Sequence, residues 1–422
     1  MEISFHTSHK RYLPNPYWNK AEELAEIVTD TWLEKNIKHV MHRLSNRPVF
    51  LSVEESNESG PYTGVGGIGY SFLRCAKLIQ WFSPEKCVEN CNNFLRMQMS
   101  HSQDVVNDRS ARYLTGDLGL LTIQTISDCI GKKSTTEAIV KIRKMVDHFV
   151  SSSSRSAVED ELFNGRAGFL ASILTLRFET GCEVISDVAV CQILEVIIKS
   201  GRMNSMRNKS PHPLTFYWHD KEYLGAAHGL SGILQILFGF WDLLDDSSKQ
   251  DVVETLDWLL STQSEDGNFP SSTSRIGSGN YELVHWCHGA AGVIHLLISA
   301  YIVLEKDKYL QAARKCAECI WLKGILRKGP GICHGVSGNA YAFLLMYRLT
   351  QEENFVLRAK SFAAIMMNSG YQKLARTPDA PLSLFEGWAG SLCFLSDLAN
   401  PMFAQFPMVP IPFNRRENTE ST

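Results

Sequence analysis

Seven short Gly-x-x-Gly turns recur along this chain of 422 residues, and each is followed by an apolar run with the character of a helix. A single turn of this kind carries almost no information, but seven that each open an apolar segment form a strong internal repeat. The turns occupy residues 64–67, 116–119, 165–168, 229–232, 289–292, 335–338 and 387–390. Repetition of one unit indicates that neighbouring units stack and share a core.

A more polar stretch precedes each turn. In residues 249–262, Val252, Leu256 and Leu259 recur at helical spacing among acidic residues. The other stretches span 21–44, 85–99, 135–150, 186–199, 307–322 and 354–368. A helix that is apolar on one side is half-exposed, whereas a helix that is apolar nearly all round must be buried. The chain is therefore predicted to be all-α: an α/α barrel (toroid) of seven helical hairpins, with an inner ring of helices within an outer ring.

The two ends of the chain differ in character from the repeats. Residues 1–20 contain prolines that favour extended backbone, which predicts an N-terminal arm. Residues 406–422 are rich in proline and then in charge, which predicts a flexible C-terminal tail. No linker divides residues 21–405, so we expect them to form one barrel domain.

The ends of the predicted inner helices indicate where a ligand would bind. Each inner helix begins after a glycine turn and leaves several backbone N–H groups without a partner. If the seven ends meet at one mouth of the barrel, that mouth favours anions and carboxylates. Two long connections, residues 201–223 and 264–285, are candidates for a lid or a recognition surface.

The composition excludes several classes of function. A net charge of -3 and a pI near 6.5 give no reason to expect a nucleic-acid partner. The longest nearly unbroken apolar run, residues 232–241, is too short to cross a bilayer. The chain lacks the features of a secretory signal and contains 11 cysteines, an odd number that fits reduced thiols better than disulfides. We expect a cytoplasmic protein, and peripheral contact with the plasma membrane is compatible with this.

Cysteine and histidine stand together before two successive turns. Cys287 and His288 precede the fifth turn, and Cys333 and His334 precede the sixth. Zinc prefers thiolate and imidazole ligands, and three protein ligands with one open position are typical of a catalytic zinc site. Cysteines are often simply buried in a core, but both of these stand outside the packed face of an inner helix. We predict one zinc per chain, held by Cys287, Cys333 and His334. His288 as a fourth ligand would close the site, and we expect it to line the mouth instead.

Other residues before the turns could move protons or bind anions. His228 occupies the same position before the fourth turn. A lone histidine is more often structural, but this register favours a general acid or base. Lys328 lies five residues before Cys333, and Arg376 lies before the seventh turn. On composition alone Lys328 would be a solvated loop residue, and Arg376 belongs either to a turn or to an anion clamp.

Longer motifs link the chain to a known family. They read EYLGAAHGLSGIL (222–234), HWCHGAAG (285–292), KGPGICHGVSGNAYAFLL (328–345), SLFEGWAGSLCFLSDL (383–398) and RYLPNPY (11–17). In these motifs the chain resembles the eukaryotic LanC-like proteins, relatives of the bacterial lanthionine cyclases. The match runs through all seven repeats, and its motifs are highly specific.

The resemblance implies a fold and a reaction. It implies the α/α barrel and a zinc held by Cys287, Cys333 and His334. It also implies a zinc-dependent glutathione transferase, which adds the glutathione thiolate to dehydroalanine or dehydrobutyrine residues in proteins or peptides and so forms a thioether. Zinc lowers the pKa of a bound thiol, which fits such a reaction. The partners would be glutathione and proteins or peptides that contain dehydroamino acids.

The resemblance also implies roles for individual residues. Arg11, Lys328 and Arg376 match basic residues that contact glutathione in members of the family. His228 matches the catalytic histidine and would protonate the enolate that forms after thiolate attack. The bacterial cyclases carry an aspartate near an early turn, and residues 164–166 (Asn-Gly-Arg) offer no counterpart here.

Two other classes of function remain open at this stage. The first is a non-catalytic zinc- and glutathione-binding signalling adaptor, which would not need His228. The second is a carbohydrate enzyme on an α/α barrel, which would need a pair of carboxylates at the mouth. No such Asp/Glu pair recurs in the turns, so the carbohydrate enzyme ranks last.

Overall fold

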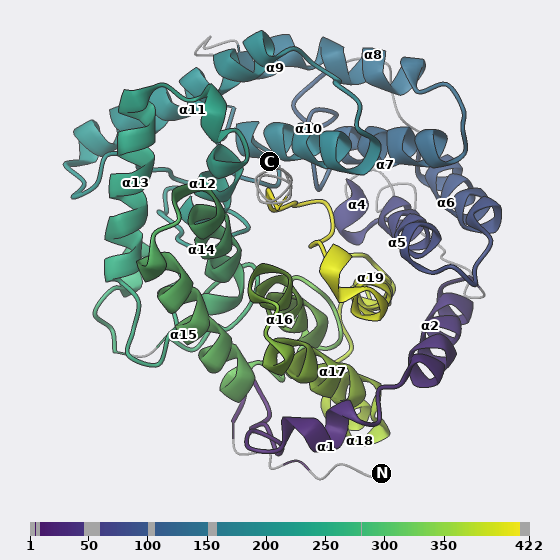
Figure 1. Ribbon diagram of the computed structural model, residues 1–422. Helices are drawn as coiled ribbons and strands as arrows, with labels where there is room; N and C mark the ends of the chain where they lie inside the picture. Colours follow the sequence, from purple (N-terminus) through teal and green to yellow (C-terminus); the bar gives the residue numbers. More distant parts are fainter. Residues whose placement is uncertain are drawn as a thin grey trace.

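The computed structural model is a ring of helices, seen end-on in Figure 1. It describes residue 5 and residues 9–45, 60–99, 106–150, 158–279 and 281–413. Regular structure in these residues is helical, and β pairing is limited to isolated bridges. The prediction of an all-α barrel with an inner and an outer ring is confirmed. None of the described helices is long and apolar enough to cross a membrane.

The inner ring contains one helix from each repeat, beginning just after the first glycine of its turn. These helices are α5 (Val65–Leu78), α7 (Asp117–Ile130), α10 (Arg166–Thr180), α12 (Leu230–Gly239), α14 (Ala290–Leu304), α16 (Val336–Thr350) and α19 (Trp388–Ala399). Burial follows the apolar pattern that the sequence predicts. Twelve of the 15 residues of α14 are buried, whereas only five of the 16 residues of outer helix α13 are buried.

The outer ring covers the inner one. Its helices are α2 (Asp30–Ser45), α6 (Pro84–Met99), α8 (Thr136–Lys144) with α9 (Val146–Val150), α11 (Asp187–Asn208), α13 (Asp246–Ser261), α15 (Asp307–Lys323) and α17 (Glu353–Met367). Short helical segments lie in the connections: α1 (Ala21–Ala25), α4 (Gly60–Thr63), α18 (Ser369–Leu374), η1 (Trp241–Leu243), η2 (Thr273–Arg275) and η3 (Pro401–Phe403). Helix α11 extends to Asn208, so the predicted loop at 201–223 begins only at residue 209.

A steric requirement explains why glycine recurs at the end of each turn. A Cβ atom on the second glycine would lie 1.9–2.3 Å from the carbonyl oxygen of the residue six positions earlier, in all seven turns. In the fifth turn, for example, Gly292 meets the carbonyl of Trp286 at 1.9 Å. Real Cβ atoms do not approach backbone so closely, so only glycine lets the chain fold back onto the first turn of its helix.

Backbone hydrogen bonds connect neighbouring turns around the mouth, the end of the barrel where the inner helices begin. The residue two positions before the first glycine of one turn donates its N–H to the carbonyl of its equivalent in the next turn. These bonds join Cys287 to Cys333 (3.3 Å), Cys333 to Phe385 (2.8 Å), Phe385 to Tyr62 (3.2 Å), Tyr62 to Leu114 (2.8 Å) and Leu114 to Phe163 (3.0 Å). We call this chain of contacts the backbone belt. In the described chain it stops at the fourth turn, where the equivalent residue is Ala227.

The first and last hairpins close the ring on the side away from the mouth. Helix α19 packs against α5 and α2. Arg74 of α5 donates hydrogen bonds to both carboxylate oxygens of Asp397 in α19, and Tyr341 of α16 donates to the same carboxylate at 2.6 Å. Arg74 and Asp397 are buried. Because neither charge would be tolerated there alone, the pair requires that both ends of the barrel be present.

The predicted flexible tail from residue 406 is wrong for residues 406–413. These residues run from α19 into the middle of the ring, as the yellow segment in Figure 1 shows, and nearly all of them are buried. Tyr113 donates a hydrogen bond to the carbonyl of Met408 at 2.8 Å. The prolines misled the prediction: because proline has no N–H, a proline-rich segment can lie on an apolar axis without leaving donors unpaired. Residues 414–422 lie outside the described residues.

The predicted N-terminal arm is docked where it is described. Leu13 is buried and donates its N–H to the carbonyl of Ile325 at 2.8 Å. Asn15 donates to the carbonyl of Trp321 at 3.0 Å. These contacts hold the arm beside residues 324–327, which lead into the sixth turn. Within 1–20, residues 1–4 and 6–8 lie outside the described part of the chain.

Candidate metal centre and catalytic mouth

Two neighbouring turns bring a cluster of metal-ligating side chains together at the mouth. The Sγ atoms of Cys287 and Cys333 and a ring nitrogen of His334 lie within 4.8 Å of one another. Cys333 is 2% exposed, whereas Cys287 and His334 are half-buried. The structure therefore assembles the three residues predicted as zinc ligands, with part of the cluster open to the mouth.

Local backbone packing explains how two separate turns reach one point. The N–H of Cys287 donates to the carbonyl of Cys333, and the N–H of Cys333 donates to Phe385, so both cysteines sit in the backbone belt. Gly289 follows with φ +93°, a conformation that disfavours other residues. A Cβ on Gly331 would lie 2.3 Å from the carbonyl oxygen of Glu386, so the sixth turn also approaches the seventh closely.

The electrostatics of the cluster suit a cation. Burial raises the pKa of the Cys333 thiol well above its usual range, and the neighbouring Cys287 raises it further. Burial lowers the pKa of His334, but the hydrogen bond and the charge of Cys333 outweigh burial and raise it above 6.5. Without a cation, two thiolates would be unfavourable side by side in a buried place. A metal ion supplies the missing positive charge.

Two other histidines flank the cluster. His288 does not belong to it, and the ring of His288 lies 5.5 Å from that of Tyr223. The Nδ1 atom of His285 lies 3.9 Å from Cys287 Sγ, a contact that the sequence analysis missed. Burial, with a smaller contribution from His334, lowers the pKa of His285 to about 3. Burial similarly lowers the pKa of His288 to about 4, so both rings are neutral near pH 7.

His228 is held in one orientation by a carboxylate and an aromatic ring. Its Nδ1 atom donates to Glu161 Oε2 at 2.8 Å. The ring of Trp218 stacks on its face with centroids 3.8 Å apart and planes at 6°. This hydrogen bond fixes the tautomer, so Nε2 is the atom that can take up or give a proton. The turn that carries His228 also touches the metal turn, because a Cβ on Gly225 would lie 2.2 Å from the carbonyl oxygen of Cys287.

The sequence analysis missed Glu161, whose carboxylate accepts the hydrogen bond from His228. The search for a carboxylate stopped at residues 164–166, but Glu161 lies four residues before the glycine of the third turn. It is 2% exposed, and its oxygens accept the N–H groups of Phe163 (2.8 Å) and Asn164 (2.5 Å) as well as that of His228. Phe163 is the residue at which the backbone belt stops. The carboxylate therefore accepts the N–H of Phe163, which makes no hydrogen bond within the backbone belt.

The three basic residues expected to contact glutathione lie on neighbouring backbone segments. The N–H of Arg327 donates to the carbonyl of Arg11 at 2.9 Å, and the N–H of Arg376 donates to the carbonyl of Arg327 at 2.6 Å. Lys328 is exposed and close enough to lower the pKa of His285, His288 and His334. The side chain of Arg376 is exposed, and its role at the site stays a prediction.

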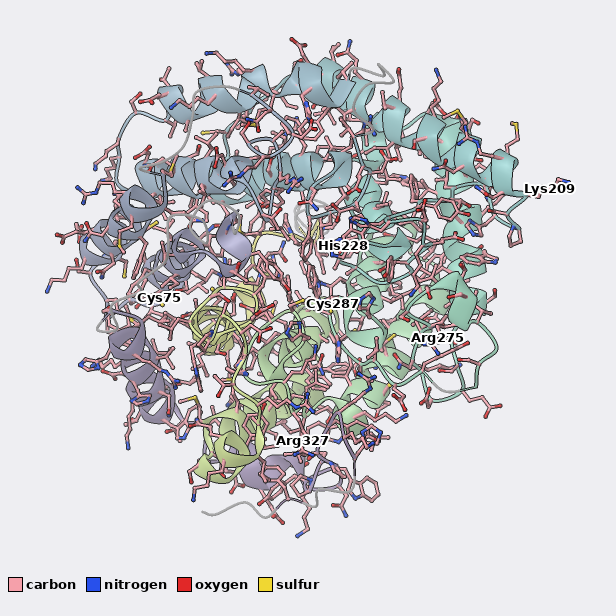
Figure 2. All side chains as sticks on the ribbon, turned by 180° about the vertical axis from the view of Figure 1, so that it is seen from behind. Cys75, Lys209, His228, Arg275, Cys287 and Arg327 are labelled. Atoms are coloured by element: carbon pink, nitrogen blue, oxygen red, sulfur yellow. The ribbon has the colours of Figure 1, made fainter. Side chains whose placement is uncertain are left out.

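The long connection before the fifth turn forms a pocket on the rim. Arg11 and Arg275 line a cavity of about 310 Å³ with Ser271, Ser278 and Tyr281. Arg11 pairs there with Glu282 at 2.9 Å. Viewed from behind in Figure 2, His228 and Cys287 lie near the middle of the ring, Arg275 lies farther out, and Lys209 lies at the outer edge.

Known proteins resemble this chain along nearly its whole length. A family model described as lanthionine synthetase C-like protein matches residues 55–411. Glutathione S-transferase LANCL1 of Danio rerio is 32% identical over 416 residues, which covers 95% of this chain and 99% of the relative. Among solved structures, nisin cyclase aligns with a TM-score of 0.60 at 16% identity, covering 89% of this chain and 98% of the cyclase. At that identity the likeness to nisin cyclase concerns the fold.

Proposed function

Because the chain belongs to the lanthionine synthetase C-like family, we propose that it is a zinc-dependent glutathione transferase. It adds the glutathione thiolate to dehydroalanine or dehydrobutyrine residues in proteins or peptides and forms a thioether. A relative named glutathione S-transferase supports the choice of thiol. The observation that carries the proposal is the meeting of Cys287, Cys333 and His334 with the Glu161–His228 pair at one mouth.

The donor set fits zinc. Two thiolates and one imidazole leave a fourth position free, as in catalytic zinc sites, and their mutual separation is compatible with tetrahedral ligation. When bound, zinc supplies the Lewis acidity that keeps a thiol deprotonated near neutral pH. Cys287 and His334 would form the side of the centre that faces the mouth, where a thiol enters, and Cys333 would form its buried side.

His228 is placed to complete the addition. The sulfur of glutathione forms a bond to the β-carbon, the carbon–carbon π bond breaks, and its electron pair moves to the α-carbon as an enolate. His228 Nε2 then gives its proton to the α-carbon and regains one from water, while the proton of the original thiol leaves to solvent. Glu161 steadies the imidazolium because its carboxylate accepts the Nδ1–H bond.

The basic rim is suited to the rest of glutathione. The tripeptide carries two carboxylates at neutral pH, and guanidinium and ammonium groups are their natural partners. Arg11, Lys328 and Arg376 stand on adjacent backbone segments, which supports a shared role in binding the two carboxylates. Binding there would leave the sulfur free to reach the metal cluster.

A direct experiment tests the proposal. Purified protein with its metal content measured is incubated with glutathione and a peptide that contains dehydroalanine. We expect an adduct equal in mass to the sum of peptide and glutathione, formed faster than in the absence of protein. Metal-loaded protein that binds glutathione yet forms no adduct would instead favour the adaptor.

Removing Lys328 or Arg376 is expected to weaken glutathione binding. In Lys328→Ala and Arg376→Ala the glutathione concentration for half-maximal rate rises, while metal content stays at the wild-type level, because neither residue is a ligand. A charge-assisted hydrogen bond contributes about 1.5–3 kcal/mol, so a rise of roughly tenfold or more is expected. Steady-state kinetics at limiting glutathione provide the measurement.

Lys35→Ala on outer helix α2 is the control, because Lys35 is exposed and lies far from the mouth in sequence and in the ring. Unchanged kinetics in both variants would remove these residues from the site.

Replacing Glu161 with glutamine is expected to slow the reaction without changing glutathione binding. The amide oxygen can still accept one N–H bond, but the negative charge that supports the imidazolium of His228 is lost. Because part of the rate enhancement from general acid catalysis is lost, we expect kcat to fall on the order of ten- to a hundredfold. The KM for glutathione and the metal content should not change. A fall in thermal stability with an unchanged kcat would show that Glu161 only holds the third turn.

A further inference from the structure

The connection before the fourth turn ends in a tight hairpin, residues 217–222, beside the mouth. Trp218 and Lys221 exchange backbone hydrogen bonds in both directions, at 3.0 and 3.1 Å. Between them His219 and Asp220 have φ of +46° and +57°. Two successive residues with positive φ are found in type I′ turns, which join the strands of tight hairpins. Holding both residues there costs backbone strain, which the surrounding contacts must offset.

The base of this hairpin is anchored to the second long connection. The N–H of Thr273 donates to the carbonyl of Glu222 at 3.1 Å, and the N–H of Leu224 donates to the carbonyl of Ser271 at 3.1 Å. The side chain of Glu222 is buried, and its Oε1 atom lies 3.2 Å from Nε2 of His212, which is also buried. The two long connections therefore brace one another, and the hairpin stands on a fixed base.

The hairpin places an indole on the proton donor of the proposed reaction. The ring of Trp218 lies parallel to that of His228 at 3.8 Å, and the ring of Phe163, from the third repeat, lies 4.4 Å from it at a tilt of 52°. Glu161 accepts the Nδ1–H bond at 2.8 Å. With these neighbours around it, the side chain of His228 is 18% exposed. Three segments that are distant in sequence thus hold one imidazole.

Firm placement of this imidazole matters for the chemistry. A hydrogen bond at Nδ1 is a single pivot about which the ring can still turn, whereas an indole stacked on its face removes that freedom. Displacement of a reacting group by about 1 Å can cost on the order of 100-fold in rate. A donor that moves away from the enolate leaves protonation of the α-carbon to water.

We propose that the hairpin positions the proton donor: Trp218 fixes the plane of the His228 ring, and the turn at residues 219–220 fixes Trp218. The inference rests on the addition reaction of the proposed function. Trp218 is a positioning residue, because it acts through His228. A stereochemical consequence follows. Because the α-carbon becomes a stereocentre when it is protonated, a donor held on one side gives mainly one of the two thioether diastereomers.

Trp218→Leu tests this in the full chain with glutathione and a chiral peptide that contains dehydroalanine. We expect kcat to fall about 10- to 100-fold, while the KM for glutathione stays unchanged. The ratio of the two diastereomers, separated by chromatography, should move towards one to one, because water can protonate either face. Trp218→Phe keeps an aromatic ring against His228 and should retain most of the rate and of the selectivity.

Two changes in the turn test the second step without altering the rings. Asp220→Gly suits a positive φ and should react as wild type does. Asp220→Val places a β-branched residue where positive φ is strongly disfavoured, so it should lower kcat and shift the diastereomer ratio in the same direction as Trp218→Leu. Thermal melting and metal content are measured for every variant, because a smaller amount of folded protein lowers the yield without changing the ratio.

The outcomes separate this inference from the proposed function. If Trp218→Leu keeps the wild-type diastereomer ratio, whether or not its rate falls, the inference fails while the proposed function stands. A wild-type adduct with equal amounts of both diastereomers would also overturn it, because the donor would not be fixed on one side. Wild-type behaviour of Asp220→Val would refute the role of the turn. If wild type forms no adduct at all, the proposed function fails first.

Discussion

We expect the replacement of His228 with asparagine to slow thioether formation by about two to four orders of magnitude, the usual contribution of general acid catalysis. Metal and glutathione binding remain, because His228 lies outside the metal cluster. Asparagine can still contact Glu161 but cannot deliver a proton. Water must then protonate the enolate. The measurement is single-turnover adduct formation on a dehydroalanine peptide, together with metal content and thermal melting.

A histidine from the same loop provides a matched control for that experiment. His219 is exposed and adjoins Trp218, the residue whose ring stacks on His228. Its φ of +46° is one that asparagine tolerates, so His219→Asn changes the same chemical group without strain. This variant should react at the wild-type rate. An unchanged rate in His228→Asn with intact metal would contradict the assignment, and a folding defect would mark His228 as structural.

We expect the replacement of Cys287 or Cys333 with alanine to reduce bound metal from about one zinc per chain to almost none, and adduct formation to fall with it. Two remaining ligands cannot hold the ion against solvent, whereas three with an open position can. Helical content should change little, because the glycine turns and the apolar inner helices form the core without the metal. Elemental analysis and circular dichroism give the two readings.

The control for the cysteine variants is another buried thiol. Cys393 on α19 is fully buried, and burial raises its pKa well above the usual range, which makes it an inert core residue. Cys393→Ala should keep its metal. If Cys287→Ala and Cys333→Ala both lose their helical signal along with the metal, the zinc would be structural and the mouth would need another explanation.

The ring could be predicted because its cause is local. The second glycine of each turn is required because a Cβ there would clash with the carbonyl oxygen six residues earlier in the chain. Each inner helix is apolar nearly all round because it is buried. The metal cluster could be predicted for a related reason. Cys287 and Cys333 share one register of adjacent repeats, and a closed ring brings equal registers together.

The missed features depend on contacts between distant segments. Glu161 meets His228 only because the third and fourth turns are neighbours, and nothing near Glu161 in the sequence marks it. Tyr62 meets Phe385 only after the seventh hairpin has come round to the first. The buried C-terminal segment was misread because prolines are typical of a frayed chain end. Proline also lacks an N–H, so it is equally suited to the buried axis of the ring, where no acceptor is needed.

The closure of the ring also sets an order in which the protein can become active during its synthesis. Tyr62 leaves the ribosome early, but its carbonyl accepts the amide of Phe385, which is made more than 300 residues later. Until α19 and residues 404–413 have emerged, the earlier hairpins form an open arc whose inner helices expose apolar surface. Such an arc is prone to aggregate. The backbone contact between Cys333 and Phe385 can form only when the last hairpin has docked, so we expect the metal cluster to take its final geometry only after synthesis of that hairpin.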